Sequence, residues 1–444
     1  MTEAFPILPD HVAIAAQQNK HRGMRRMITR ERADLIFVYA GYSLRYLYLL
    51  VLTPFYGRVL GVEGYAQVLA AMSLMNMVWL FVGWGFLPAG GRSIATSERG
   101  GYGSIFWQHF GARSLLAVLA VAGGVIACMI SPIFSSAPLI GLFAVLLGIT
   151  SAYNLGWYFT GSQRPRYAVM LEITGFMLSI VPILIFVRGP EDAETVLSCL
   201  LFSSIMSLLL AHWLVRKEVI PVQKSIRKGY ALIRSSSTLF IYSCSSAILV
   251  ASSTFLLSLL ADETEVGHFG AAERLVSVGL SIMGPAGQIF IPRITALFVK
   301  DEAAAYQAIR KATALLLSVG FGGLVFSLAC GAWVIPLIFG QGFEGSVPIL
   351  QILAFVFPLA AHNLILGSYV LIPQHRERSL TRLTLLGAAL NLAIAIPASL
   401  AWGATGMAAA RVAGEAAVSI LLIIVTWHMG ILSKLFSFRQ QGQS

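Results

Sequence analysis

The sequence has little charge and few cysteines for its length. Only 11% of its 444 residues are Asp, Glu, Lys or Arg and 57% are hydrophobic, whereas soluble domains average about 25% charged residues. The mean hydropathy is +0.78, and apolar segments recur along the whole chain. This composition excludes a soluble globular protein and predicts an all-α integral membrane protein with many spans.

Several motifs that would indicate enzymatic chemistry are also absent from the sequence. There is no Gly-x-x-x-x-Gly-Lys-Ser/Thr phosphate loop, no His-Glu-x-x-His and no Gly-x-Ser-x-Gly. Cys128, Cys199, Cys244 and Cys330 lie in apolar segments without a Cys-x-x-Cys pair, which favours neither a disulfide nor a metal site. We therefore expect no cofactor, no metal ligand and no catalytic residue, and transport not powered by ATP bound to this chain.

Apolar windows bounded by charged or turn residues predict about 12 transmembrane helices. They fall near residues 36–57, 65–88, 114–131, 138–160, 167–187, 195–215, 237–260, 270–292, 313–339, 347–372, 380–402 and 406–428. Six spans precede and six follow the longest internal loop, which predicts two six-helix lobes around a central cavity. The expected domains are a basic N-terminal segment (1–35), an N-terminal lobe (36–215), a basic linker (216–236), a C-terminal lobe (237–428) and a tail (429–444).

In a soluble domain a net charge of +11 would suggest nucleic-acid binding. Here the positions of the basic residues along the chain indicate the cytoplasmic side of a membrane instead. All but five of the 31 Lys and Arg residues lie on one side of the predicted spans, and the loops on the other side are acidic. Because Lys and Arg mark cytoplasmic loops, the N-terminal segment, the linker, the tail and both termini are predicted to be cytoplasmic. The five exceptions are Arg45, Arg58, Arg188, Arg274 and Arg411.

Arg45 lies in the first predicted span, near the middle of the bilayer at about 1.5 Å rise per residue. Tyr42 and Tyr46 share its helix face. Because a charge at the bilayer centre is costly, such residues face cavities or partners. The group predicts a binding site for an anion or a sugar.

A second polar pattern runs along the eighth predicted span. Its members recur at steps of three and four residues, namely Gly270, Arg274, Ser277, Ser281, Gly284 and Gln288. Such a stripe on one helix face predicts contact with water or substrate, and Pro285 together with Gly279 predicts a bend. With Asn76 in the second span, this pattern predicts that spans 1, 2, 7 and 8 wall the cavity. Tight helix packing by small and hydroxyl residues is the alternative, above all in the serine-rich seventh span.

Two glutamates in apolar spans are candidates for ion coupling. Glu273 precedes Arg274 and could neutralise it or titrate. Glu415 follows Arg411 by four residues, which predicts an ion pair on one helix face, with proton coupling as the alternative. His362, Asn363 and Asn391 are expected to form hydrogen bonds between helices.

Five segments, taken in order, resemble the Wzx-type polysaccharide flippases of the multidrug/oligosaccharidyl-lipid/polysaccharide exporter superfamily. They are residues 60–95, 157–173, 265–297, 338–354 and 390–415. The resemblance implies a flippase that moves an undecaprenyl-pyrophosphate-linked oligosaccharide repeat across the bacterial inner membrane by alternating access, for O-antigen, capsule or exopolysaccharide synthesis. It further implies that cationic side chains in the cavity hold the pyrophosphate, which here would be Arg45 and Arg274. The lipid bilayer, a polysaccharide polymerase and export machinery are the implied partners, with no nucleic acid.

Two other functions compete with this interpretation. A cation-coupled multidrug or metabolite exporter of the same superfamily would favour acidic cavity helices, which Arg45 argues against. A membrane-embedded polymerase or ligase would need a sizeable external catalytic loop, whereas the predicted external loops, including 188–194 and 261–269, are short.

Overall fold

The structure, a computed structural model, describes residues 10–219 and 226–436. Side chains within helices are described except for most of residues 10–50, residues 242–252 and several isolated positions. The described part of the chain contains helices and no strand. Eight of its helical stretches are long and apolar enough to cross a membrane, so the all-α membrane fold predicted from composition is confirmed, while the count of 12 spans stays a prediction.

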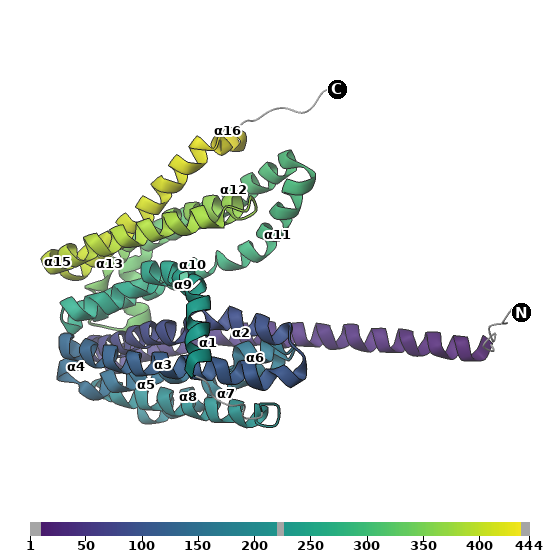
Figure 1. The fold of residues 1–444 in the computed structure, drawn as a ribbon. Coiled ribbons are helices and arrows are strands. Elements are labelled where there is room, and N and C mark those ends of the chain that lie inside the picture. Colours follow the sequence, from purple (N-terminus) through teal and green to yellow (C-terminus); the bar gives the residue numbers. More distant parts are fainter. Residues whose placement is uncertain (1–9, 220–225, 437–444) are drawn as a thin grey trace, which may run out of the picture.

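The helices form two groups, which lie one above the other in Figure 1. The first group contains α1 (Asp10–Gly83), α2 (Phe86–Ala95), α3 (Tyr102–Ile130), α4 (Pro132–Ser136), α5 (Pro138–Ala152), α6 (Gly156–Gly161), α7 (Pro165–Phe186) and α8 (Ala193–Val215). The second contains α9 (Ile226–Leu260), α10 (Glu263–Ser281), α11 (Gly284–Lys300), α12 (Glu302–Phe339), α13 (Ser346–Leu353), α14 (Val356–Asn363), a π-helical segment (Leu364–Leu371), α15 (Glu377–His428) and α16 (Ile431–Phe436).

Two of the long helices contain a sharp break at a glycine with positive φ. Gly61 interrupts α1 with φ +67°, and Gly403 interrupts α15 with φ +54°. In α15 the two halves pack antiparallel, since Gly387 lies against Val418 and Gly406 against Ala398. The Asn391 side chain donates to the carbonyl of Ala410 at 2.9 Å between them. The breaks fall between predicted spans 1 and 2 and between predicted spans 11 and 12. Both positions have a positive φ, which glycine adopts without the steric cost that other residues meet.

The eighth predicted span is divided into two helices. Helix α10 ends at Ser281 and α11 begins at Gly284, with proline in its first turn. Proline cannot donate the backbone hydrogen bond that would continue α10, which confirms the predicted bend. Gly279 remains inside α10, where it packs against Phe357.

Helix α9 contacts both groups of helices. At its N-terminal end, the backbone of Ile233 accepts a hydrogen bond from the indole of Trp84 at 3.0 Å, and Phe240 stacks on the same indole. Near its C-terminal end, Thr254 donates to Glu273 of α10, and the carbonyl of Ser258 accepts a hydrogen bond at 2.7 Å from Ser131, between α3 and α4. Figure 1 shows α9 spanning the gap between the groups.

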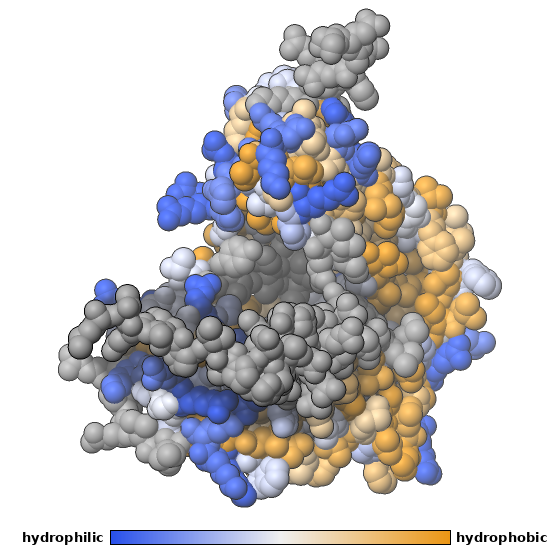
Figure 2. All heavy atoms as spheres, turned by 90° about the vertical axis from the view of Figure 1, so that its right-hand side faces the viewer, coloured by the Kyte–Doolittle hydropathy of each residue, from blue (hydrophilic) through white to orange (hydrophobic). Residues whose placement is uncertain are grey.

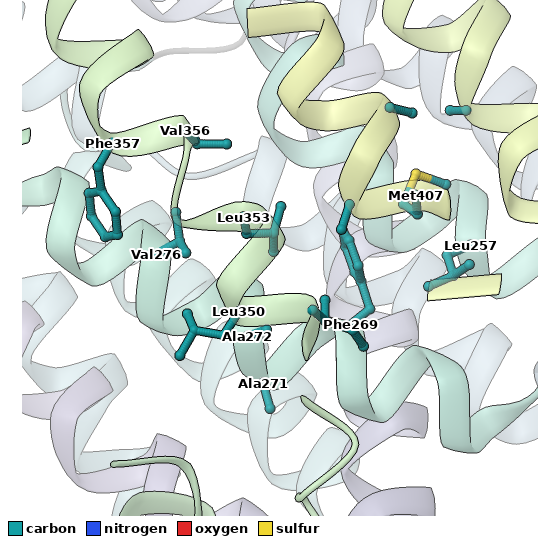
Figure 3. Close-up of a cluster of buried hydrophobic side chains, with 14 of the residues drawn as sticks. Leu257, Phe269, Ala271, Ala272, Val276, Leu350, Leu353, Val356, Phe357 and Met407 are labelled. Atoms are coloured by element: carbon teal, nitrogen blue, oxygen red, sulfur yellow. The ribbon is translucent and has the colours of Figure 1, made fainter. Parts of the chain in front are cut away.

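Much of the core of the second group is apolar. Figure 3 shows side chains of α9, α10, α13, α14 and α15 converging there, including Leu257, Phe269, Leu350 and Met407. These side chains are at most 3% exposed. Burial of their surface fixes the position of α10 within the group, at about 25 cal/mol for each Å² of apolar surface.

Candidate substrate cavity between the helix groups

The two groups of helices are in contact at one end, which we call the closed end. Tyr65 of α1 packs against the rings of Phe339 and Phe343, which lie at and just after the end of α12. The guanidinium of Arg58 donates to the carbonyl of Leu337 in the last turn of α12. The Gln67 amide donates to the Glu263 carboxylate at 3.1 Å. Aromatic packing and these hydrogen bonds together seal this end.

The second half of α1 and helix α10 start at the closed end and run in the same direction. Gly267 lies against the backbone of Val62, and one turn further Gly270 lies against Leu69. Both glycines are buried. The absence of side chains lets the two helices approach closely at this end.

Further along, the same two helices separate. Asn76 lies seven residues after Leu69 and Ser277 seven residues after Gly270, so each continues the packed face of its helix by two turns. Both Asn76 and Ser277 are exposed. The faces that meet at the closed end are therefore apart at the other end, which we call the open end. Figure 2 shows this end, with hydrophilic residues on both groups and a hollow between them.

Arg274 lies where α1 and α10 begin to separate. Its Nε donates to the hydroxyl oxygen of Thr53 in α1, at a distance of 3.4 Å. The side chain is partly exposed, and one turn later Ser277 is exposed. The hydroxyl of Ser281, a further turn along, donates to the carbonyl of Val278 at 2.6 Å. The guanidinium therefore lies at the inner limit of the open face.

Four predicted site residues have side chains outside the described part of the structure. They are Tyr42, Arg45 and Tyr46 in α1 and Gln288 in α11. Their roles stay predictions. Arg274, Asn76, Ser277 and Ser281 are the predicted substrate-binding residues whose surroundings the structure describes.

A buried polar cluster lies behind Arg274 in the second group. The Arg411 guanidinium lies 3.8 Å from the Glu273 carboxylate and 3.5 Å from the Glu415 carboxylate. Thr254 of α9 donates to Glu273, and the Asn363 amide of α14 donates to Glu415 at 2.8 Å. The ion pair predicted from the four-residue spacing of Arg411 and Glu415 is confirmed. The sequence did not indicate that Glu273, 138 positions earlier in the chain, approaches the same guanidinium.

The predicted hydrogen bonds between helices are also present. The imidazole of His362 in α14 is hydrogen-bonded to the hydroxyl of Ser419 at 2.5 Å, and Asn363 and Asn391 bond as described above. Each bond satisfies a polar group that would be costly to bury alone. These contacts join α14 to α15 and the two halves of α15 to each other.

One arginine was placed wrongly by the sequence analysis. Arg113 was counted among the cytoplasmic loop residues, but it lies inside α3 and is only 4% exposed. Its guanidinium faces the rings of Phe86 and Trp157 at 5.6 and 5.4 Å. The aromatic residues that precede it, such as Phe106 and Phe110, were the available signal that the helix begins before residue 114.

The described residues contain no group of three or more His, Cys, Asp or Glu side chains that could hold a metal ion. The predicted site residues described at the open end contribute one guanidinium, one amide and two hydroxyls. A guanidinium can bind phosphate oxygens with two parallel hydrogen bonds, and hydroxyls and amides are partners for sugars. This arrangement suits an anionic, hydroxyl-rich ligand.

Replacement of Gly267 by leucine is expected to prevent the closed end from sealing. A Cβ at this position would lie 2.6 Å from the carbonyl oxygen of Val62, and overpacking of this kind costs about 1–3 kcal/mol. We expect the open end to close in response. Labelling of Ser277→Cys by a water-soluble maleimide in the detergent-solubilised protein, in a chain whose native cysteines are replaced, should then fall by about tenfold.

The matched control is Gly123→Leu, because Gly123 is an exposed position in α3 with open space around its Cα. Equal labelling of Ser277→Cys in both leucine variants would contradict the role of the Gly267 contact in sealing the closed end.

Comparison with known proteins places the chain in a family. The polysaccharide biosynthesis protein family matches residues 32–298. A protein of Shigella dysenteriae named as an O-antigen transporter is 24% identical over 385 residues, which is 85% of this chain and 95% of the relative. Another, from Escherichia coli (strain K12), bears the same name and is 23% identical over 407 residues, 88% of this chain and 96% of the relative.

Solved structures share the fold. The lipid II flippase MurJ in an inward closed conformation superposes with a TM-score of 0.64 at 13% identity, covering 90% of both chains. An inward-facing multidrug transporter of the MATE family superposes with a TM-score of 0.61 at 15% identity, covering 88% of this chain and 99% of the other. The match over residues 32–298, more than half of the chain, shows that this protein belongs to the polysaccharide biosynthesis protein family.

Proposed function

We propose that this protein is a flippase, which moves an undecaprenyl-pyrophosphate-linked oligosaccharide repeat unit across the bacterial inner membrane by alternating access. The observation that carries the proposal is the position of Arg274, a cation at the point where α1 and α10 separate toward the open end. Membership of the polysaccharide biosynthesis family and relatives named as O-antigen transporters support the class of substrate.

In the proposed mechanism, the pyrophosphate enters from the open end and is bound by Arg274. A guanidinium that is partly removed from water binds a phosphate more strongly than one in bulk solvent. Ser277 and Asn76 offer hydrogen bonds to the sugars, and Arg45, Tyr42, Tyr46, Ser281 and Gln288 are assigned to the same cavity. The lipid tail stays in the bilayer, because burial of its hydrocarbon there avoids the cost of transfer to water.

The open end is assigned to the cytoplasm. The basic loops that the positive-inside rule places in the cytoplasm include the connection after α8, with Arg216 and Lys217, and Arg376 before α15. The acidic Asp262 and Glu344 lie beside the closed end. In this orientation both termini are cytoplasmic and a repeat unit assembled inside the cell has access to Arg274.

The proposed movement is a rocking of one lobe against the other. The lobes correspond to residues 36–215 and 237–428, and the linker 216–236 joins them. Opening of the contact between Gly267 and Val62 and closing of the gap between Asn76 and Ser277 would expose the bound headgroup to the outside. A polysaccharide polymerase or export complex on that side would then consume the unit.

Deletion of the gene in its host tests the proposal. We expect loss of surface polysaccharide together with accumulation of complete lipid-linked repeat units facing the cytoplasm, and recovery of both on expression of the wild-type chain. Normal surface polysaccharide without accumulation, in a strain with no second flippase, would instead favour a drug or metabolite exporter.

A further inference from the structure

Helix α8 has one exposed apolar face along its length. Its members recur at steps of three and four residues, namely Phe202, Ile205, Leu209 and Trp213. This spacing places them on a single side of the helix. Figure 1 shows α7 and α8 on the side of the first group that faces away from the second group. In a membrane-spanning helix, such a face contacts the hydrocarbon of the lipids.

The two helices pack against each other in antiparallel orientation. In the middle of both helices, the hydroxyl of Ser203 donates to the carbonyl of Gly175 at 2.6 Å. At one end, the guanidinium of Arg164, just before α7, forms an ion pair with the carboxylate of Glu218, just after α8, at 2.6 Å. The first turn of α7 therefore lies beside the last turn of α8.

Each of these two turns carries an exposed aromatic residue, Tyr167 on α7 and Trp213 on α8. Tyr167 also begins a set of exposed side chains along α7, whose other members are Met170, Met177, Val181 and Leu184. Tyrosine and tryptophan are enriched where the hydrocarbon of a bilayer meets its headgroups. The two aromatic residues therefore mark the level of that boundary on this part of the surface.

Basic residues follow directly beyond the aromatic pair. Among residues 161–168 and 212–219, all of which the structure describes, four are basic and one is acidic. They are Arg164, Arg166, Arg216, Lys217 and Glu218. An excess of positive charge at the level of the headgroups attracts lipids that carry a net negative charge.

The one acid in these two ranges is already engaged. Both terminal nitrogens of Arg164 donate to the Glu218 carboxylate, at 2.7 and 2.6 Å, and the hydroxyl of Tyr158 donates to it at 2.7 Å. The hydrogen bonds from Arg164, together with that from Tyr158, hold the pKa of the Glu218 carboxyl below its usual range. Glu218 therefore neutralises Arg164 and leaves the charges of Arg216 and Lys217 to other partners.

Arg216 and Lys217 are exposed, and neither forms a hydrogen bond or an ion pair with another described residue. The Arg216 guanidinium lies over the ring of Trp213, 5.1 Å from its centroid. Stacking of this kind orients the guanidinium, while the N–H groups in its plane stay free to bind phosphate oxygens in pairs. A phosphate bound there lies next to Trp213, where the exposed apolar face of α8 begins.

We propose that this end of α7 and α8 binds a phospholipid whose headgroup carries a net negative charge. Arg216 and Lys217 bind the phosphate oxygens, while Trp213 and Tyr167 pack against the glycerol backbone and the upper part of the acyl chains. A soluble phosphate would leave the apolar part of this surface without a partner. A zwitterionic lipid would bring an ammonium group to a surface that is already positive.

The lipid site has a consequence for the chain beyond α8. Arg216 and Lys217 are the first two residues of the linker 216–236, so a bound headgroup holds the beginning of the linker at the membrane surface. Lipid binding itself does not rest on the proposed function, and its test contains no transport measurement.

Quenching of tryptophan fluorescence by brominated lipid tests the proposal. The purified full-length protein is reconstituted in phosphatidylcholine vesicles that contain one phosphatidylglycerol in five lipids. Brominated acyl chains are carried either by the phosphatidylglycerol or by an equal amount of phosphatidylcholine. The contribution of Trp213 is the difference between the wild type and Trp213→Phe. We expect brominated phosphatidylglycerol to quench this contribution about twofold more than brominated phosphatidylcholine does.

Two charge variants, each measured with and without Trp213→Phe, identify the residues responsible. Arg216→Ala with Lys217→Ala should abolish the excess quenching by phosphatidylglycerol. Arg376→Ala with Arg378→Ala removes the same charge from exposed positions at the start of α15 and should keep it. An excess that survives in the first variant would overturn the proposal. If that variant fails to fold, as judged by size-exclusion chromatography, Arg216→Gln with Lys217→Gln replaces it and must abolish the excess.

Other occupants of this surface give different results. Equal quenching by the two brominated lipids would show that Trp213 contacts bulk lipid alone. Absence of quenching by either lipid would show that protein, such as a second copy of the chain, covers the face. Loss of the excess on addition of inorganic phosphate, but not of sodium chloride at equal ionic strength, would assign the basic pair to a soluble phosphate. Each of these three results would overturn the lipid site.

Discussion

Arg411→Ala is expected to lower the free energy of unfolding by about 3–5 kcal/mol, the cost of removing one partner from a buried ion pair. The change leaves the carboxylates of Glu273 and Glu415 buried without the cation that they share. The measurement is the thermal midpoint of the detergent-solubilised protein, followed by size-exclusion chromatography, together with its yield in membranes.

A combined variant separates the charge from the packing. Arg411→Met with Glu273→Gln and Glu415→Gln keeps side chains of similar length and removes all three charges. Replacement of a buried ion pair by uncharged residues of similar size often changes the free energy of unfolding little. We therefore expect most of the stability lost in Arg411→Ala to return. If Arg411→Ala were as stable as the wild type, the burial of the two carboxylates would be contradicted.

The second large effect is expected at Arg274. Arg274→Ala removes the one cation that the described structure places at the inner limit of the open face, next to Thr53. A hydrogen bond to a charged group contributes about 1.5–3 kcal/mol, which corresponds to a loss of roughly 10–100-fold in transport. Surface polysaccharide and cytoplasm-facing repeat units in the complemented deletion strain are the measured quantities.

Two variants complete this experiment. Arg274→Lys keeps the charge but not the forked geometry of the guanidinium, so we expect partial activity. Arg376→Ala removes an exposed arginine in the turn before α15 and should leave transport unchanged. Full transport by Arg274→Ala at a normal protein level in the membrane would remove Arg274 from the substrate site.

Glu273 and Arg274 show how adjacent residues can serve different sites. Successive side chains on a helix are rotated by about 100°, so Arg274 reaches α1 while Glu273 reaches Arg411 in α15. In the sequence they are adjacent and could neutralise each other. In the structure, Glu273 forms an ion pair with Arg411, while Arg274 acts on Glu273 electrostatically and directs its Nε to Thr53.

Local pattern was sufficient for much of the fold. The excess of apolar residues determined a helical membrane protein, because a backbone in lipid must satisfy its own hydrogen bonds. Helical spacing determined the ion pair of Arg411 with Glu415, and Pro285 indicated the break between α10 and α11. The polar face of α10 followed from its period of three and four residues. These features depend on residues within a few turns of one another.

The tertiary structure decided which residues that lie far apart in the sequence come into contact. It brought Glu273 to Arg411, enclosed Arg113 between Phe86 and Trp157, and packed Leu69 against Gly270 while leaving Asn76 and Ser277 apart. None of these contacts leaves a periodic signal, because each joins helices separated by a long stretch of chain. The sequence by itself determined which helix faces are polar; the packing of the two helix groups decided which of those faces are sealed, which are open and which charges are shared.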